Sequence, residues 1–277
     1  MTDKEILSIV AHIHLEWLPT QLPVKVKQLL NMIIDLEINF QAMTYQQYAE
    51  KEGWFHSPFQ FKRYFHSLEG KIIYLPDDDL YVLLYNQAQI IERKKWTLAH
   101  ELGHYFCGHL NQLHSGQVID EYTNQRIEAE ANRFARYLLA PPWLLASVTG
   151  TYGYTDAMSF YALCRFLFRL SQEASYYIAV SSHNTFYHYG IKNLASHWNP
   201  LPLQKKYQPI IDDIIFKQLP TQPDFNSFVD AYRYEYNLIS WLCTSQRIGL
   251  IHGPVSAAQI LAECNTSDSA QHKGIKK

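Results

Sequence analysis

Small and apolar residues recur at three- and four-residue intervals within residues 92–109, a spacing that places them on one face of an α-helix. The positions on this face are Trp96, Ala99, Gly103 and Cys107. A second long helix is predicted over residues 120–142, with Thr123 as its N-terminal cap and two consecutive prolines at its end. We therefore expect two long helices in the central part of the chain.

Short apolar runs before these helices predict a small sheet. Strands are expected at residues 38–42, 71–75 and 80–85, and the last two flank the turn 76–79. The aspartates of this turn lack the glycine and the distal glutamate of a calcium-binding loop, so the turn is interpreted as polar and metal-free. We expect residues 80–85 to form the free edge of the sheet, where an extended peptide could add as a further strand.

The remaining pattern is helical and changes in composition after about residue 196. Further helices are predicted at residues 24–37, 45–53, 156–170, 171–182, 203–219, 224–246 and 254–263. The fold class is therefore α+β, with a small, mostly antiparallel sheet packed on the helix of residues 92–109. We expect a main domain over residues 1–195, a small helical C-terminal region over 196–264 and a disordered tail over 265–277.

Composition narrows the classes of function. A net charge of −2 gives no general reason to expect nucleic-acid binding, and the four cysteines lack the CxxC spacing of a zinc ribbon. The helix pair at 156–182 carries only Arg165 and Arg169 as basic residues, so we expect it to pack on the core rather than bind DNA. A signal peptide and an apolar run of about 18 residues are both missing, which predicts a cytoplasmic protein with no membrane partner.

The chemistry of the chain lies in the pentapeptide His100-Glu101-Leu102-Gly103-His104. A four-residue step along a helix rotates the side chain by only about 40°, so both imidazoles point the same way and can bind one Zn²⁺. Glu101 stands about 100° around the helix from His100, where a general base for the attacking water belongs. The alternative is an exposed helix with two histidines and no metal. Whether the chain supplies further ligands distinguishes the two interpretations.

Glu128 is the expected third ligand, because it shares a helix face with the small residues Ala131 and Ala135. Small residues allow close approach to the first helix, with Gly103 as the matching position. Asn132, one turn after Glu128, could accept the spare N–H of a ligating histidine.

Glu130 is the rival ligand. It lies about 200° around the helix from Glu128, so both cannot face the metal, and the alanine-lined face favours Glu128. A solvated acidic face at the start of a helix would also explain two carboxylates, since the helix dipole favours them there. A solvated face does not explain why alanines share the helix face of Glu128.

His109 does not fit the longer zinc-peptidase pattern H-E-x-x-H-x-x-G-x-x-H. The pattern requires glycine and histidine where the chain has Cys107 and Leu110. If the helix continued, His109 would also lie about 180° around it from His100. We expect His109 to be a helix-end histidine near the C-terminal dipole rather than a ligand.

Two runs of sequence resemble the ImmA/IrrE family of metallopeptidases. Residues 97–104 read T-x-A-H-E-L-G-H, and residues 128–141 read E-x-E-A-N-x-F-A-x-x-L-L-x-P. The resemblance extends over about residues 20–185 and implies a zincin-like core. It also implies that His100, His104 and Glu128 bind the metal and that Glu101 is the base. Related gluzincins often carry aspartate where Asn132 stands, and an asparagine orients the histidine without adding charge.

The resemblance implies a zinc endopeptidase whose substrate is a specific helix-turn-helix repressor, cleaved to switch on genes of a mobile element or a stress response. A second hypothesis is a module of an antirepressor or toxin–antitoxin system that keeps the zinc site and binds the repressor without cutting it. The intact Glu101 argues against such a module, because a pure binder needs no base. Spacing does not select the oxyanion donor among the nearby candidates Tyr105, His109, His114 and Tyr122.

Overall fold

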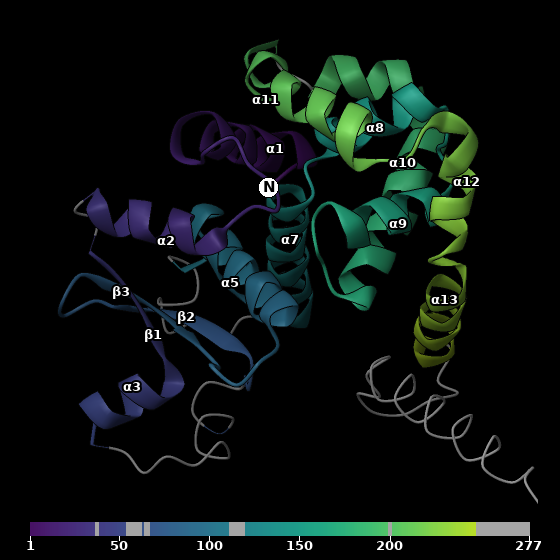
Figure 1. The fold of residues 1–277 in the computed structure, drawn as a ribbon. Helices are drawn as coiled ribbons and strands as arrows, with labels where there is room; N and C mark the ends of the chain where they lie inside the picture. Colours follow the sequence, from purple (N-terminus) through teal and green to yellow (C-terminus); the bar gives the residue numbers. More distant parts are fainter. Residues whose placement is uncertain (37–38, 54–62, 64–66, 111–119, 199–200, 248–277) are drawn as a thin grey trace, which may run out of the picture.

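The computed structural model describes residues 1–36, 39–53, 63, 67–110, 120–198 and 201–247, and these residues are mostly helical with one small sheet (Figure 1). The helices are α1 (Asp3–His12), α2 (Val26–Asp35), α3 (Tyr45–Lys51), α5 (Ile91–Phe106), α7 (Glu121–Leu139), α8 (Pro142–Tyr152), α9 (Ala157–Phe166), α10 (Gln172–Trp198), α11 (Leu201–Asp213), α12 (Gln222–Asp230) and α13 (Arg233–Arg247). Two π-helical turns, η1 (Ile13–Trp17) and η2 (Ile214–Gln218), follow α1 and α11. The strands are β1 (Phe40–Thr44), β2 (Gly70–Leu75) and β3 (Leu80–Tyr85).

The three strands are arranged in the order β1-β3-β2, with β1 parallel and β2 antiparallel to β3. The sheet is therefore mixed, which corrects the expected mostly antiparallel sheet. Strand β3 pairs with its hairpin partner β2 on one side and with β1 on the other. The expectation that residues 80–85 form a free edge is also wrong, because β3 is central and β1 and β2 are the edges among the described strands.

The central position of β3 has a signal in the sequence that the alternation argument missed. Val82, Leu83 and Leu84 are consecutive and all buried, which is typical of a strand covered on both faces. Leu83 belongs to the main core, whereas Val82 and Leu84 pack in a smaller cluster with Tyr45 and Tyr48 of α3.

Helix α1 was not predicted, although its capping box marks its start. The Thr2 hydroxyl accepts a hydrogen bond from the Glu5 N–H at 3.3 Å, and the Glu5 carboxylate accepts one from the Thr2 N–H at 2.7 Å. The two bonds satisfy amide groups that the first turn of a helix leaves unpaired. Ile6 and Val10 then anchor α1 in the core.

The boundaries of the two central helices differ slightly from expectation. Helix α5 ends at Phe106 rather than continuing to residue 109. The N-terminal cap of α7 is Asp120, whose carboxylate accepts from the Thr123 N–H at 2.8 Å, so the expected Thr123 cap is wrong. Asp120 can reach the N–H groups of the first turn because it precedes that turn in extended conformation.

Helices α5 and α7 lie between the sheet and the group of helices α8–α13 (Figure 1). One buried apolar cluster extends from Ile6 to Cys243 and includes residues on both sides of the predicted boundary at 195/196. Helix α10 also continues across that boundary to Trp198. The division into a main domain and a C-terminal region stays a prediction, and the predicted helix 254–263 and tail lie outside the described residues.

The buried His14 joins the start, middle and C-terminal part of the chain. Its ring nitrogens contact the Tyr207 hydroxyl of α11 at 2.6 Å and the Leu138 carbonyl of α7 at 3.1 Å. Lys206 adds hydrogen bonds to the carbonyls of His14 and Leu18 at 2.7 and 2.9 Å. In the part of the chain that the structure describes, no helix is both long and apolar enough to cross a membrane.

Candidate metal centre

The site lies where α5 and α7 pack directly against each other. A Cβ atom added to Gly103 would lie 2.9 Å from the carbonyl oxygen of Ala131 and 3.2 Å from the Cβ of Phe134. The two backbones can therefore approach this closely only because residue 103 has no side chain. Gly103 and Ala131, both singled out in the sequence, lie at this contact.

This packing brings together the side chains of His100, His104 and Glu128. The Nε2 atoms of the two histidines are 3.1 Å apart, and each lies near a different oxygen of Glu128, at 3.2 and 3.5 Å. The three side chains together could hold one metal ion.

The spacing of these donor atoms suits zinc. Nitrogen and oxygen ligands lie about 2.0–2.1 Å from Zn²⁺, and at tetrahedral angles two such ligands are about 3.3 Å apart. The two Nε2 atoms are 3.1 Å apart, and each lies 3.2 or 3.5 Å from its own oxygen of Glu128, so these separations are close to that value. Two imidazoles and one carboxylate are also a donor set typical of catalytic zinc sites.

Asn132 lies behind His100, as the sequence pattern predicted. Its Oδ1 accepts a hydrogen bond from His100 Nδ1 at 3.0 Å, which directs Nε2 of the same ring toward Glu128. Burial opposes the charged form of His100, but Glu128, Glu101 and Asn132 outweigh it and raise the pKa of the imidazole. A metal ion binding to this ring would compete with a proton.

The charge states of the other two donors favour metal binding at neutral pH. The hydrogen bond from His100 lowers the pKa of Glu128, so this carboxylate is ionised. Burial, together with the neighbouring His100, lowers the pKa of His104, so this ring is neutral. An ionised carboxylate and a neutral imidazole are the forms that bind zinc.

Glu101 lies beside the donor cluster and contacts the sheet. Its side chain is buried, and the Ile72 N–H of β2 donates to its Oε2 at 2.8 Å. Burial raises the pKa of the Glu101 carboxyl. A Cβ at Gly70 would lie 3.3 Å from Cγ of Glu101 and 2.4 Å from the Thr97 side chain, so this glycine allows β2 to approach α5. The carboxylate is therefore held between a helix and an edge strand.

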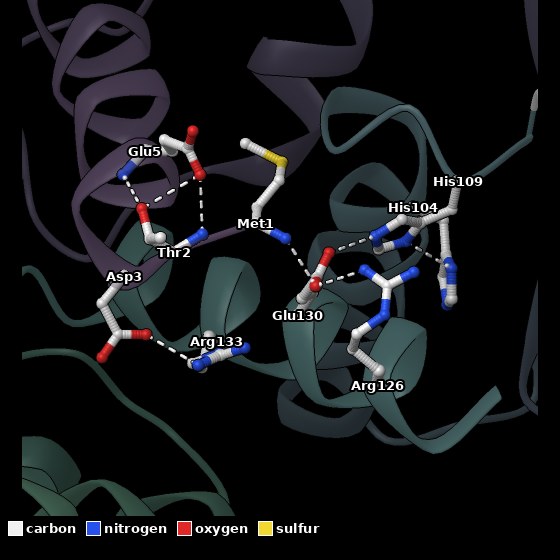
Figure 2. Close-up of polar contacts among 9 residues, drawn as sticks. All are labelled: Met1, Thr2, Asp3, Glu5, His104, His109, Arg126, Glu130 and Arg133. Atoms are coloured by element: carbon white, nitrogen blue, oxygen red, sulfur yellow. Dashed lines mark hydrogen bonds and ion pairs between the residues drawn. The ribbon is translucent and has the colours of Figure 1, made fainter. Parts of the chain in front are cut away.

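Glu130 does not face the donor cluster, in agreement with the helix-phase argument, yet it is not solvated. It is 2% exposed, and its carboxylate accepts from His109 Nε2 at 3.0 Å, from Arg126 at 2.9 Å and from the Met1 amine at 2.6 Å (Figure 2). Burial raises the pKa of Glu130, but the Met1 amine, His109 and Arg126 outweigh it and hold the value at about 2. The solvated acidic face is therefore wrong for this residue.

His109 is the residue whose position the sequence reasoning missed. It is 1% exposed, and its Nδ1 lies 3.1 Å from Nδ1 of His104 (Figure 2). The other ring nitrogen of His104, Nε2, is the one near Glu128. It is not among the three donors, as expected, but neither is it a simple helix-end histidine. It is the outer partner of His104, as Asn132 is of His100.

A turn at the end of α5 explains how His109 reaches His104. Gly108 has a φ of +70°, its N–H donates to the Tyr105 carbonyl at 3.1 Å, and the His109 N–H donates to the His104 carbonyl at 3.0 Å. This pair of bonds is the Schellman motif, which brings the second residue after the helix cap against the third residue before it. The glycine at 108 was therefore the signal that could have placed His109 over His104.

The candidate oxyanion donors are not gathered at the site. Tyr105 packs against the rings of Phe40 and Tyr81, and Tyr122 is 78% exposed at the start of α7. His109 contacts His104 and Glu130, and His114 lies outside the described residues. The donor stays unassigned.

Two histidines from one helix, a carboxylate from a second helix and a neighbouring buried glutamate define a candidate mononuclear metal site of the hydrolytic kind. Residues 61–177 match the family model of the IrrE N-terminal-like domain, a peptidase family of group M78. Since this stretch contains both α5 and α7, the predicted ImmA/IrrE resemblance is confirmed over it, and it points to a metallopeptidase. A comparison with curated proteins gives no match.

Proposed function

We propose that this protein has a zincin-like core and is a zinc-dependent endopeptidase. The observation that carries the proposal is that one ligand atom from each of His100, His104 and Glu128 lies within 4.8 Å of the other two, with the buried side chain of Glu101 beside them. A metal-binding module without hydrolytic activity would need the three ligands but not the buried glutamate.

In this proposal the residues of the chain divide the work between binding and proton transfer. His100, His104 and Glu128 hold Zn²⁺, which supplies a Lewis acid for the scissile carbonyl. Glu101 takes the proton of the attacking water and passes it to the departing amine. Burial raises the pKa of Glu101, which makes it a better proton acceptor and suits a group that must both take and give a proton near neutral pH.

The edge strand β2 is the proposed place for the substrate backbone. An extended peptide can add to an unpaired sheet edge through main-chain hydrogen bonds. Strand β2 is an edge of the sheet among the described strands, and one of its N–H groups, that of Ile72, is already paired with Glu101. A peptide lying along β2 would therefore pass directly in front of the proposed base.

We further propose that the substrate is a helix-turn-helix repressor and that its cleavage in the cytoplasm derepresses genes of a mobile element or a stress response. The support for this part is the family resemblance of the two sequence runs. The alternative, a module that binds the repressor without cutting it, keeps the same metal site.

The test uses the zinc-loaded protein and the repressor encoded beside its gene, followed by electrophoresis and mass spectrometry. Wild type should cut the repressor at one position, and chelation should stop the reaction. Glu101→Gln should lower the rate by roughly 10²–10⁴-fold, as expected for loss of a general base, while zinc content is unchanged. Glu121→Gln, at an exposed position of α7, is the matched control.

Two outcomes would change the assignment. Tight binding of the repressor without cleavage by wild type would support the non-cleaving module. Full activity of Glu101→Gln would remove Glu101 from the role of base.

A further inference from the structure

Two buried polar side chains, His109 and Glu130, form a series of contacts that begins at His104 and leads away from the donor cluster. The contacts run from His104 Nδ1 to His109 Nδ1 at 3.1 Å and from His109 Nε2 to Glu130 at 3.0 Å. Glu130 also binds Arg126 and the Met1 amine, so the series of contacts ends in two cationic groups (Figure 2). Neither His109 nor Glu130 belongs to the donor set or is the proposed base.

The hydrogen-bonding partners determine which atom donates and which accepts in each of these contacts. Glu130, paired with two cations, accepts, so His109 carries its proton on Nε2. A neutral imidazole with a proton on Nε2 has a lone pair on Nδ1, which can only accept. His104 must then donate its own Nδ1–H, which leaves its Nε2 without a proton. That nitrogen is the one that faces Glu128 and His100.

We propose that His109 and Glu130 are positioning residues that hold His104 as the Nδ1–H tautomer, with Nε2 directed at the metal. The proposal rests on metal binding in the proposed function and not on cleavage. The two ligating histidines then differ in their outer partners. His100 donates to the neutral and exposed amide of Asn132, whereas His104 donates to a buried histidine supported by a carboxylate.

The elements around this series of contacts limit its movement. The Schellman turn fixes His109 at the end of α5, and α7 supplies Glu130 one turn after Arg126. One turn further along α7, Arg133 pairs with Asp3 at 2.8 Å without joining the series (Figure 2). Arg133 is thus a suitable control position on the same helix.

Zinc affinity is the first readout, measured by competition with a chromogenic chelator. His109→Phe keeps a ring but removes the acceptor, and should weaken affinity about 10–100-fold, as is usual when the outer partner of a ligand is lost. His109→Asn can present an oxygen near the position of Nδ1 and should recover most of the loss. Glu130→Gln keeps an acceptor without charge and should weaken binding less than His109→Phe. Arg133→Gln should bind zinc like wild type.

The second readout is ring ¹⁵N NMR of the metal-free wild-type protein, which needs no variant to fold. His104 should be protonated at Nδ1 and His109 at Nε2. Protonation of His109 at Nδ1 would overturn the proposal, and so would unchanged zinc affinity in folded His109→Phe. If the wild-type protein binds no zinc, the proposed function fails. If the wild-type protein binds zinc tightly and the variants bind it equally tightly, only the positioning role is refuted.

Discussion

Asn132 and His109 make the same kind of contact with different histidines of the candidate site, and at the scale of single residues they are the outer partners of these rings. Each contacts Nδ1 of one histidine, at 3.0 and 3.1 Å, and so directs Nε2 of that ring to the donor cluster. The outer contact fixes both the tautomer and the orientation of a ligating imidazole. The amide of Asn132 is more exposed to solvent than the ring of His109, so water can replace it more easily.

Replacing Asn132 should therefore weaken the site without destroying it. Asn132→Ala is expected to lower zinc affinity by about tenfold, at the lower end of what loss of an outer partner costs. The measurement is chelator competition, with Asn124→Ala at an exposed position of α7 as the control. Equal affinities for the two variants would show that Asn132 does not orient His100.

The sequence could predict those residues of the site whose positions follow from helix geometry. The angular step of one helix separated Glu128 from Glu130, and the alanine-lined face chose Glu128; the structure places the two side chains on different partners. His109 could not be placed by the same rule because the helix ends before it. Its position depends on the backbone turn at Gly108.

At the scale of elements, the contact between α5 and α7 decides whether the site exists, because each helix supplies only part of it. Gly103→Ala should destabilise the protein by about 1–3 kcal/mol, the usual range for overpacking, since its Cβ would press on backbone atoms of Ala131. It should also weaken zinc binding, because separating the helices moves Glu128 away from the histidines. Urea unfolding and chelator competition measure the two effects.

Gly150→Ala provides the matched control for this prediction. Gly150 lies in α8, and a Cβ there would meet nothing within 4 Å. Alanine should stabilise this helix by up to about 1 kcal/mol, because glycine is the less favourable residue in a helix. A similar loss of stability in both variants would show that the close contact at Gly103 is not the cause.

The order of the strands was harder to predict than the helices. The strand positions follow from local apolar runs, but order and direction depend on how the connections between the strands run in space. The buried run of β3 indicated only a strand covered on both faces, and the turn at residues 76–79 showed only that β2 and β3 are neighbours. The place of β1 depends on a connection through α3 whose path local sequence does not specify.

At the scale of the whole molecule, His14 connects η1, α7 and α11 and makes stability depend on pH. Burial lowers the pKa of His14 from the usual 6.5 to about 4. The unfolded chain therefore binds this proton first as the pH falls. The stabilising contribution of the neutral ring is present above pH 6.5 and is lost progressively toward pH 4.

Between pH 7 and pH 5 this single residue should remove roughly 2 kcal/mol from the free energy of unfolding. His14→Gln should be less stable than wild type at pH 7, but its stability should fall less on going to pH 5. Urea unfolding at both pH values measures the difference, with His12→Gln, an exposed position of α1, as the control. An identical decrease in His14→Gln and wild type would contradict the prediction.

The Schellman turn also bears on how this chain can vary over evolution. One additional helical turn at the end of α5 would place residue 109 about 140° around the helix from His104 and away from its ring. Insertions and deletions between the second histidine of the motif and this turn should therefore be selected against, although the segment contains no metal ligand and no base. The length of a helix, and not only the identity of its residues, is then under selection for the chemistry of the site.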